Sequence, residues 1–428
     1  MREMKDSGIE WIGAIPQDWQ LSKIGSLYTQ RNEKVSDNDY QPLSVTMQGI
    51  LPQLATAAKT DDGDNRKLVR VGDFAINSRS DRRGSCGISP LDGSVSLINI
   101  ILTPRTAMHP GYYNWLFHTT LFADEFYKWG HGIVADLWTT RWQEMKSITV
   151  PVPEYAEQKR IVTFLDAQCA EIDAVLEKTR ASIEEYKKLK QAVITQAVTK
   201  GIHGDRPMKD SGIEWIGEIP AEWDVVRQKY FWNTVESGVS VNAADKPVDN
   251  SEQYGVLKTS AVSKFVFIPT EHKQVNLEEY GRVSCPVRAD SIIASRMNTP
   301  ELVGACGYVQ NNYPNLFLPD RLWQITFKDR LSPKYVWYYL SGIRVRQYIS
   351  SLSTGTSSSM QNISQSQYGN ILITIPSVEE QSEITKYLDE KYAGIDALIA
   401  KKQQYLTEIE NYKKSLIYEY VTGKKEVV

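Results

Sequence analysis

The residues of this chain that are best suited to bind a ligand through hydrogen bonds are arginines in the polar stretch NSRSDRRGSCG. Arg79, Arg82 and Arg83 follow an apolar run that is typical of a β-strand. A later stretch of similar pattern, ADSIIASRMN, has Arg296 and Asn298 at the corresponding place. Arginine can donate two hydrogen bonds to guanine, and asparagine or glutamine can bind adenine in the same bidentate way. Both stretches are therefore candidates for contacting base edges.

Arg79 and Arg296 differ from their neighbours because both stretches keep arginine there, which favours holding phosphate over reading a base. The alternative for every one of these residues is ordinary surface charge on a strand–turn connection. Two polar loops further along the chain are second candidates, with a structural loop that closes the domain as the alternative. The candidate DNA-binding residues of these loops are Thr139, Thr140 and Arg141 in the first, and Ser358, Gln361 and Asn362 in the second.

Patterns for catalysis or metal binding are sparse in this sequence. It contains no GxGxxG, Walker loop, HExxH or GxSxG. Its four cysteines form no CxxC pair, and its five histidines lack metal-ligand spacing. Cys86 and Cys306 stand between small residues and are expected to be packed thiols. The sequence therefore predicts binding without catalysis.

Length and composition indicate an ordinary soluble protein. The 428 residues favour two to four domains. No apolar run approaches the roughly 20 residues of a membrane span, and the N-terminus lacks a signal-peptide pattern. These features and the scarce cysteines favour a cytoplasmic location. The net charge of −3 argues against a non-specific nucleic-acid binder that acts alone.

The candidate residues lie in a sequence unit that occurs twice in the chain. The stretch MKDSGIEWIGAIP from Met4 returns as MKDSGIEWIGEIP from Met208, with twelve of thirteen letters identical. The spacing between later matches rises to 223 residues at Pro110 and Pro333 and then stays constant to the end. The first half of each unit therefore tolerates insertions and divergence, whereas the second half is constrained. Divergence confined to the first half suggests that the two copies contact different things there.

The constrained half is predicted to be a long helix, because apolar residues recur at helical spacing from Glu157 to about Lys200. Ser377 and Glu380 form a capping-box pattern at the start of the second helix, and Gly201 and Gly423 mark the helix ends. Two such helices in one chain favour an intramolecular antiparallel coiled coil; the alternative is that they dimerise between chains. The residues expected to pack are Ile161, Leu165, Ile172 and Ile183 in the first helix, and Ile384, Leu388, Ile395 and Leu406 in the second.

The expected fold is α/β, with two globular domains joined by two long antiparallel helices and an internal duplication with pseudo-twofold symmetry. The repeated segment itself is expected to be a packing clip, and its first copy is expected to dock where the second helix ends. One proline-led helix is predicted after the last strand of each domain. The expected boundaries are 1–152 and 205–375 for the globular domains, and 153–204 and 376–428 for the helical regions. Strands are predicted within 74–79, 96–104, 291–296 and 321–327.

These features together resemble the DNA-specificity subunits of type I restriction–modification systems, over the whole chain. The resemblance is carried by motifs that occur twice and in order. They are SGIEWIG followed by Trp19 or Trp223, the helix starts Pro153 with Glu157–Gln158 and Pro376 with Glu380–Gln381, the helices FLDAQCAEIDAVLEK and YLDEKYAGIDALIAK, and the ends VTKG and VTGK.

The resemblance implies a non-catalytic subunit in which two target-recognition domains each read one half of a bipartite, asymmetric DNA site. The helices would act as a ruler between the half-sites and dock two modification subunits. S-adenosylmethionine, ATP and magnesium would then belong to the modification and restriction subunits, and no cofactor would bind to this chain. The competing hypotheses are a coiled-coil scaffold that binds protein without DNA specificity, and an enzyme with an unrecognised site. The sequence leaves open the target bases, the spacer length, the base-reading residues, the activity of partner subunits and the oligomeric state of the isolated chain.

Overall fold

A computed structural model describes residues 2–53, 63–105, 108–132, 138–250, 252–357 and 360–427, with the backbone alone at 356 and 357. The chain divides into two compact units. Unit 1 contains Met1–Arg180 and Gln403–Val428, and unit 2 contains Ala181–Lys402. Each unit therefore holds one globular domain together with a part of both long helices. This arrangement follows the duplication that the sequence predicts.

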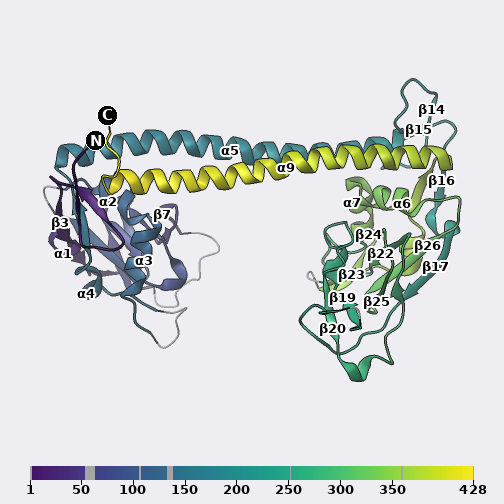
Figure 1. Cartoon of the computed structure of the whole chain (residues 1–428), viewed down its shortest axis with the longest axis horizontal. Helices are drawn as coiled ribbons and strands as arrows, with labels where there is room; N and C mark the ends of the chain where they lie inside the picture. Colours follow the sequence, from purple (N-terminus) through teal and green to yellow (C-terminus); the bar gives the residue numbers. More distant parts are fainter. Residues whose placement is uncertain are drawn as a thin grey trace. The chain divides into compact units, whose positions relative to one another are not determined.

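The two long helices are α5 (Tyr155–Lys200, 46 residues) and α9 (Val378–Val421, 44 residues) (Figure 1). Glycines with left-handed backbone follow both helices, Gly201 at φ 76° and Gly423 at φ 71°, as predicted for the helix ends. Within each unit, ascending positions on α5 contact descending positions on α9, so the helix segments are antiparallel. These contacts are Asp173–Lys413 and Arg180–Glu410 in unit 1, and Tyr186–Lys402 and Lys190–Asp396 in unit 2.

The predicted packing residues of the helices are buried or half-buried, but several contact the globular domains as well as the other helix. Ile161 and Leu165 join the aromatic core of unit 1, which also contains Leu416 of α9. Ile384 and Leu388 join the equivalent core of unit 2. The helices are thus part of the domain cores. Of the other predicted packing residues, Ile183 and Ile395 are buried, and Ile172 and Leu406 are half-buried.

The main sheet of unit 1 has four antiparallel strands in the order β10-β9-β12-β4. Alternate side chains of its central strands enter two different cores. Phe74 and Ile76 pack in the core formed with α2 and α3, whereas Ala75 and Ile101 pack in a second core on the other face. Both faces of the sheet are therefore covered. The strands are β4 (Tyr28–Arg31), β9 (Phe74–Asn77), β10 (Cys86–Ile88) and β12 (Asn99–Pro104).

The remaining elements of unit 1 are short strand pairs, a three-stranded sheet in the order β11-β8-β5, and short helices. The strands are β1 (Met4–Asp6), β2 (Ala14–Pro16), β3 (Gln20–Lys23), β5 (Lys34–Val35), β6 (Leu43–Thr46), β7 (Gly49–Pro52), β8 (Arg66–Val69), β11 (Gly93–Val95) and β13 (Thr149–Val152). The helices are α1 (Ile24–Leu27), the 3₁₀ helix η1 (Ser80–Arg82), α2 (Pro110–Phe117), α3 (Thr120–Lys128) and α4 (Trp142–Met145).

Unit 2 repeats the same main sheet, in the order β24-β22-β26-β17, all antiparallel (Figure 1). Ile292 and Ala294 face the core formed with α6 and α7, and Ile293 faces the opposite core. The four strands thus occupy the same order as their counterparts in unit 1. They are β17 (Trp232–Ser237), β22 (Ser291–Ser295), β24 (Cys306–Val309) and β26 (Leu322–Phe327).

The other sheets of unit 2 are larger than their counterparts in unit 1, with orders β18-β20-β19-β25-β21 and β23-β28-β27. Their strands, with two further pairs, are β14 (Met208–Asp210), β15 (Glu218–Pro220), β16 (Asp224–Arg227), β18 (Ala243–Ala244), β19 (Gly255–Leu257), β20 (His272–Val275), β21 (Pro286–Val287), β23 (Met297–Asn298), β25 (Tyr313–Phe317), β27 (Thr354–Ser357), β28 (Met360–Asn362) and β29 (Leu372–Ile375). The helices are η3 (Gln228–Phe231), η4 (Thr259–Val262), η5 (Leu277–Glu279), α6 (Pro333–Ser341), α7 (Ile343–Leu352) and α8 (Gln365–Gly369).

The single proline-led helix predicted for each domain is wrong in one respect, because the structure has two helices at each place. The break between α2 and α3 lies at Thr119, whose Oγ1 accepts a hydrogen bond from the backbone nitrogen of Phe122 at 3.2 Å. The break between α6 and α7 lies at Gly342, which has extended backbone with ψ 138°. The apolar pattern continues through both breaks, so it gives no sign of them.

The duplicated segment forms a hairpin that is attached to a helix by one carboxylate. In unit 1 the indole Nε1 of Trp19 donates to Glu157 Oε2 at 2.9 Å, and Arg2 pairs with the same carboxylate. In unit 2 the indole Nε1 of Trp223 donates to Glu380 Oε2 at 2.7 Å, and Arg206 donates to its Oε1 at 2.6 Å. The Ser377 hydroxyl accepts from the Glu380 backbone at 3.2 Å. The Glu380 carboxylate therefore binds the clip, which the capping-box pattern did not predict.

The first clip docks where α9 ends, as predicted. Lys424 Nζ donates to the carbonyl of Ile12 at 2.6 Å, and the Tyr418 hydroxyl donates to the same oxygen at 3.0 Å. A Cβ on Gly423 would lie 2.4 Å from Pro16 Cδ, so the chain after α9 passes directly over the clip. The N- and C-terminal segments therefore lie side by side (Figure 1).

Candidate nucleic-acid interface

The predicted arginine stretch and the predicted polar loop of unit 1 are brought together by backbone hydrogen bonds. Arg79 and Thr139 form an antiparallel bridge. The backbone nitrogen of Ser80 donates to the carbonyl of Trp138 at 2.9 Å, and that of Thr140 donates to the carbonyl of Ser78 at 3.0 Å. Two candidate segments about 60 residues apart in the chain thus form one surface.

The three arginines of this surface are paired with acidic side chains. Arg79 Nε donates to Asp81 Oδ1 at 3.1 Å, and Arg82 Nε lies 3.8 Å from Asp81 Oδ2. Arg83 pairs with Asp124, and its guanidinium lies 5.6 Å from the centre of the Tyr127 ring. The Arg82 side chain remains 68% exposed. Exposed ion pairs of this kind contribute about 0–1 kcal/mol, so a phosphate group can compete for these guanidinium groups.

The other two candidates of this loop, Thr140 and Arg141, lie in different surroundings. Thr140 is 0% exposed, and its Oγ1 donates to the carbonyl of Phe126 at 2.8 Å. The prediction of a DNA contact for Thr140 is therefore wrong: its hydroxyl satisfies a buried carbonyl and fixes the loop on α3. Arg141 is exposed at the start of α4 and remains a candidate.

Unit 2 joins its two candidate segments in the same way. β23 pairs with β28, so that Met297 is opposite Asn362 and Asn298 is opposite Gln361. The backbone nitrogen of Ile363 donates to the carbonyl of Arg296 at 3.0 Å. The predicted residues Asn298, Gln361 and Asn362 therefore lie on adjacent strands, and Arg296 stands immediately before β23. Ser358, the remaining prediction for this loop, lies outside the described residues.

The side-chain amides of Asn298 and Asn362 on this strand pair differ in their hydrogen bonds. Asn298 Oδ1 accepts from the backbone nitrogen of Thr299 at 2.9 Å, which restricts the orientation of its amide. Asn362 Oδ1 is buried and has no hydrogen-bond partner in the described part of the chain. A buried amide oxygen without a partner is unfavourable by about 1–3 kcal/mol, so Asn362 is the amide of this pair that most needs a further donor.

Arg346 of α7 supports this surface through the loop that follows β23. Its Nη2 donates to the carbonyls of Val303 at 2.6 Å and Glu301 at 3.2 Å, in the loop that follows β23. Its side chain is buried, and burial lowers the pKa of its guanidinium. Arg346 lies on a helix that looks amphipathic in sequence, where an arginine normally points to solvent. Its role therefore becomes visible only in the structure.

The cysteines of the matching strands are packed thiols, as predicted. Cys86 and Cys306 are both fully buried. Burial raises the pKa of Cys306 to about 11 and that of Cys86 further. Both thiols therefore stay protonated at neutral pH, which excludes a role as nucleophile. In the described ranges, no group of three or more His, Cys, Asp and Glu side chains is arranged to hold a metal ion.

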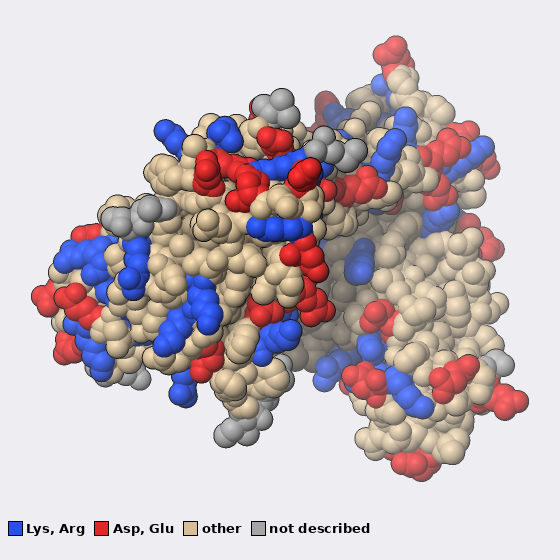
Figure 2. All heavy atoms as spheres, turned by 60° about the vertical axis from the view of Figure 1, so that its left-hand side comes forward, with Lys and Arg blue, Asp and Glu red and all other residues tan. Residues whose placement is uncertain are grey.

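Charges of both signs are mixed on the surface. Figure 2 shows lysine and arginine side chains interspersed with aspartate and glutamate on the face that it draws, in agreement with the small net charge. No helix in the described part of the chain is both long and apolar enough to span a lipid bilayer.

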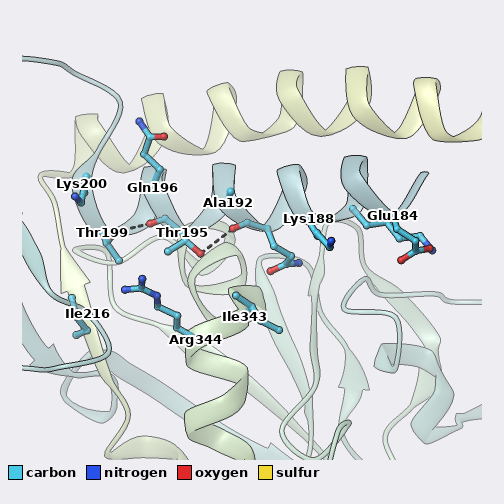
Figure 3. A pocket seen from close by; sticks show the side chains of 12 residues that line it. Glu184, Lys188, Ala192, Thr195, Gln196, Thr199, Lys200, Ile216, Ile343 and Arg344 are labelled. Carbon is cyan, nitrogen blue, oxygen red and sulfur yellow. Dashed lines mark hydrogen bonds and ion pairs between the residues drawn. The ribbon is translucent and has the colours of Figure 1, made fainter. Parts of the chain in front are cut away.

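Each unit also has a hollow between a long helix and the second helix of its globular domain. In unit 2 the hollow has a volume of about 830 Å³ and lies between α5 and the start of α7 (Figure 3). Figure 3 shows Lys188, Lys200 and Arg344 around it, with the Thr195 and Thr199 hydroxyls bonded to the α5 backbone. The hollow of unit 1 measures about 220 Å³, between α9 and α3. Its residues Leu121, Lys414, Ser415 and Tyr418 stand 223 positions from Arg344, Gln191, Ala192 and Thr195 of the hollow in unit 2.

Comparison with solved structures defines the class of fold. A chain from the structure described as "Structural basis underlying complex assembly and conformational transition of the type I R-M system" superposes with a TM-score of 0.71 at 15% identity. The match covers 96% of this chain and 99% of the other. At this identity the match establishes the fold: two globular domains with two long antiparallel helices and an internal duplication.

Sequence comparison shows which proteins the chain is similar to. Residues 220–408 match the model of the type I restriction modification DNA specificity domain. The type I restriction enzyme MjaVIII specificity subunit of Methanocaldococcus jannaschii is 27% identical over 296 residues, which is 66% of this chain and 63% of the relative. The type I restriction enzyme EcoKI specificity subunit of Escherichia coli is 21% identical over 285 residues, which is 65% of this chain and 58% of the relative. The family model and these relatives therefore show that the chain is similar to type I restriction–modification DNA-specificity subunits.

Proposed function

We propose that this chain is the sequence-specific DNA-recognition subunit of a type I restriction–modification complex, and that each globular domain reads one half of a bipartite, asymmetric site. One observation carries the proposal. Both units join the segment after the central strand to the polar loop, at Arg79–Thr139 and at Asn298–Gln361, yet the side chains there differ. One scaffold with two sets of hydrogen-bonding groups is what the readers of two different half-sites require.

The helices in this proposal set the distance between half-sites and dock the partner subunits. Half-sites on one face of B-DNA are about 34–36 Å apart for each helical turn, and a helix is suited to hold a fixed length because its rise is constant at about 1.5 Å per residue. The equivalent hollows beside α5 and α9 support two copies of one partner, which we infer to be two modification (methyltransferase) subunits. Restriction (translocase and nuclease) subunits would complete the complex.

The chain itself is non-catalytic in this proposal. S-adenosylmethionine, ATP and magnesium would bind to the modification and restriction subunits and supply methyl transfer to adenine and DNA translocation there. This chain would determine where on the DNA those reactions take place. The isolated chain is expected to show no catalytic turnover with S-adenosylmethionine, ATP or magnesium.

The test is to express the chain together with its modification subunit and to map N6-methyladenine in the host DNA by sequencing. A bipartite methylated motif that disappears when this chain is omitted is the expected result. Absence of such a motif, or its persistence without the chain, would contradict the proposal. Exchange of residues 17–150 for another recognition domain should change one half-site only, and a change in both would contradict the assignment of one half-site to each domain.

A further inference from the structure

We propose that the β6–β7 hairpin of unit 1 is a ribbon that enters the DNA major groove and reads an A·T base pair with Met47 and Gln48 at its tip. The inference rests on the proposed function and adds a reading element that the arginine stretch and the polar loop do not include. B-DNA's major groove is about 12 Å wide and admits a two-stranded β-ribbon. The turn of this short hairpin exposes the side chains of Met47 and Gln48, as this mode of reading needs.

The tip of the hairpin presents its side chains in a fixed orientation. Met47 is 71% exposed, and Gln48 is exposed beside it. The Thr46 hydroxyl accepts from the backbone nitrogen of Gln48 at 3.1 Å and donates to the carbonyl of Gly49 at 2.9 Å. Gly49 takes a left-handed backbone with φ 105°, which closes the turn. The tip is therefore ordered before it meets a ligand, which lowers the entropic cost of binding.

The hairpin is fixed to the domain along its strands and at its turn. Leu43 and Ile50 are buried in the core beneath the main sheet. The hairpin also lies directly on β10, since a Cβ on Gly87 would lie 2.9 Å from the Gly49 Cα. Only glycine allows this approach. The stretch GSCG that follows the arginines consists of small residues. Its last glycine, Gly87, therefore allows the hairpin to pack closely on β10.

The groove beside the hairpin is lined by more arginine than aspartate side chains. A groove of about 650 Å³ separates it from the segment Asn77–Ser85, and its lining includes four arginines (66, 79, 82 and 83) and one aspartate (81). The hairpin from Leu43 to Gln53 has no charged side chain. Arg66 is buried and bonded to Ser94. A duplex seated here would have its phosphates near the other three arginines, whose exposed pairs with Asp81 and Asp124 a phosphate can replace, and it would meet no carboxylate on the ribbon.

The chemistry of the tip selects the base pair. The carboxamide of Gln48 can bind N6 and N7 of adenine in a bidentate way, and the apolar Met47 side chain can contact the thymine methyl group. Unit 2 places a different segment at the equivalent position, because a Cβ on Gly307 would meet the backbone of Phe267 at 2.5 Å. The ribbon is therefore specific to unit 1, and its base pair should belong to one half-site.

The experiment uses the whole chain with its modification subunit and the methylation map described above. Gln48→Ala is expected to make one position of one half-site degenerate, with a roughly 5- to 150-fold loss of discrimination against other bases. Met47→Ala should relax the same or the adjacent position. The other half-site and the spacer should stay unchanged. Gln20→Ala, at an exposed glutamine of β3, is the matched control and should leave the motif intact.

The outcomes separate this inference from the proposed function. If the unmodified complex produces no bipartite motif, the proposed function fails and takes the inference with it. If it produces the motif and Gln48→Ala leaves every position as specific as before, the inference alone is wrong. A change in both half-sites, or loss of all methylation with normal amounts of assembled complex, also overturns it, since a reading residue is expected to relax one position.

Discussion

Replacement of Glu380 by alanine should detach the second clip from the start of α9. The carboxylate is 11% exposed and accepts from the Trp223 indole at 2.7 Å and from Arg206 at 2.6 Å. Without it the buried indole N–H would be unpaired, and Arg206 would keep only the exposed carboxylate of Glu222 at 3.1 Å and the carbonyl of Lys200 at 3.0 Å. Removal of one member of a buried ion pair typically costs about 3–5 kcal/mol; because Arg206 keeps its contact with Glu222, we expect a loss at the lower end, about 3 kcal/mol, in the free energy of unfolding of unit 2.

Glu383→Ala provides a control on the same helix, one turn away, with the same change of charge. Glu383 is 54% exposed and pairs with His203 at 2.8 Å, so its removal should cost about 0–1 kcal/mol. Urea unfolding followed by tryptophan fluorescence measures the difference, and hydrogen exchange over residues 208–220 shows whether the clip loosens. If both variants shift the unfolding midpoint equally and leave exchange in the clip unchanged, the reasoning from the buried carboxylate is refuted.

Three further predictions follow from the described contacts. Arg79→Ala and Arg296→Ala should each weaken DNA binding by the assembled complex across all sequences and lower the slope of log K against log salt by about one; a change of the recognised bases with an unaltered slope would assign them to base reading instead. Burial lowers the pKa of His118, so the unfolded chain binds its proton more readily and stability should fall as the pH drops through about 6.5. Thermal midpoints from pH 8 to 5 should show a smaller acid loss in His118→Gln, and equal losses would contradict the linkage. Gly394→Ala should raise stability by about 0.5–1 kcal/mol, because a Cβ there meets nothing within 4 Å in the middle of α9; a lower urea midpoint would contradict this.

The candidate surface could be predicted from sequence only in part. Arginines after an apolar strand were identifiable because strand periodicity and polar turns are local signals. The burial of Thr140 and the support from Arg346 were not, because each depends on a neighbouring helix whose approach no local pattern specifies. The hairpin at Met47 and Gln48 was also missed, although strand–Gln–Gly–strand spacing is a usable signal for a turn.

The sequence by itself determined the duplication, the extent of the two long helices and their glycine ends. These features are local: an apolar stripe at helical spacing and a glycine after the last turn act within a few residues. Tertiary structure alone decided that Arg79 meets Thr139 and that Asn298 meets Gln361. Those pairs join backbone segments about 60 residues apart, and their register depends on how the intervening helices pack on the sheet. The physical reason is that hydrogen bonds between strands are the same for any side chain, so the sequence of either segment does not specify its partner.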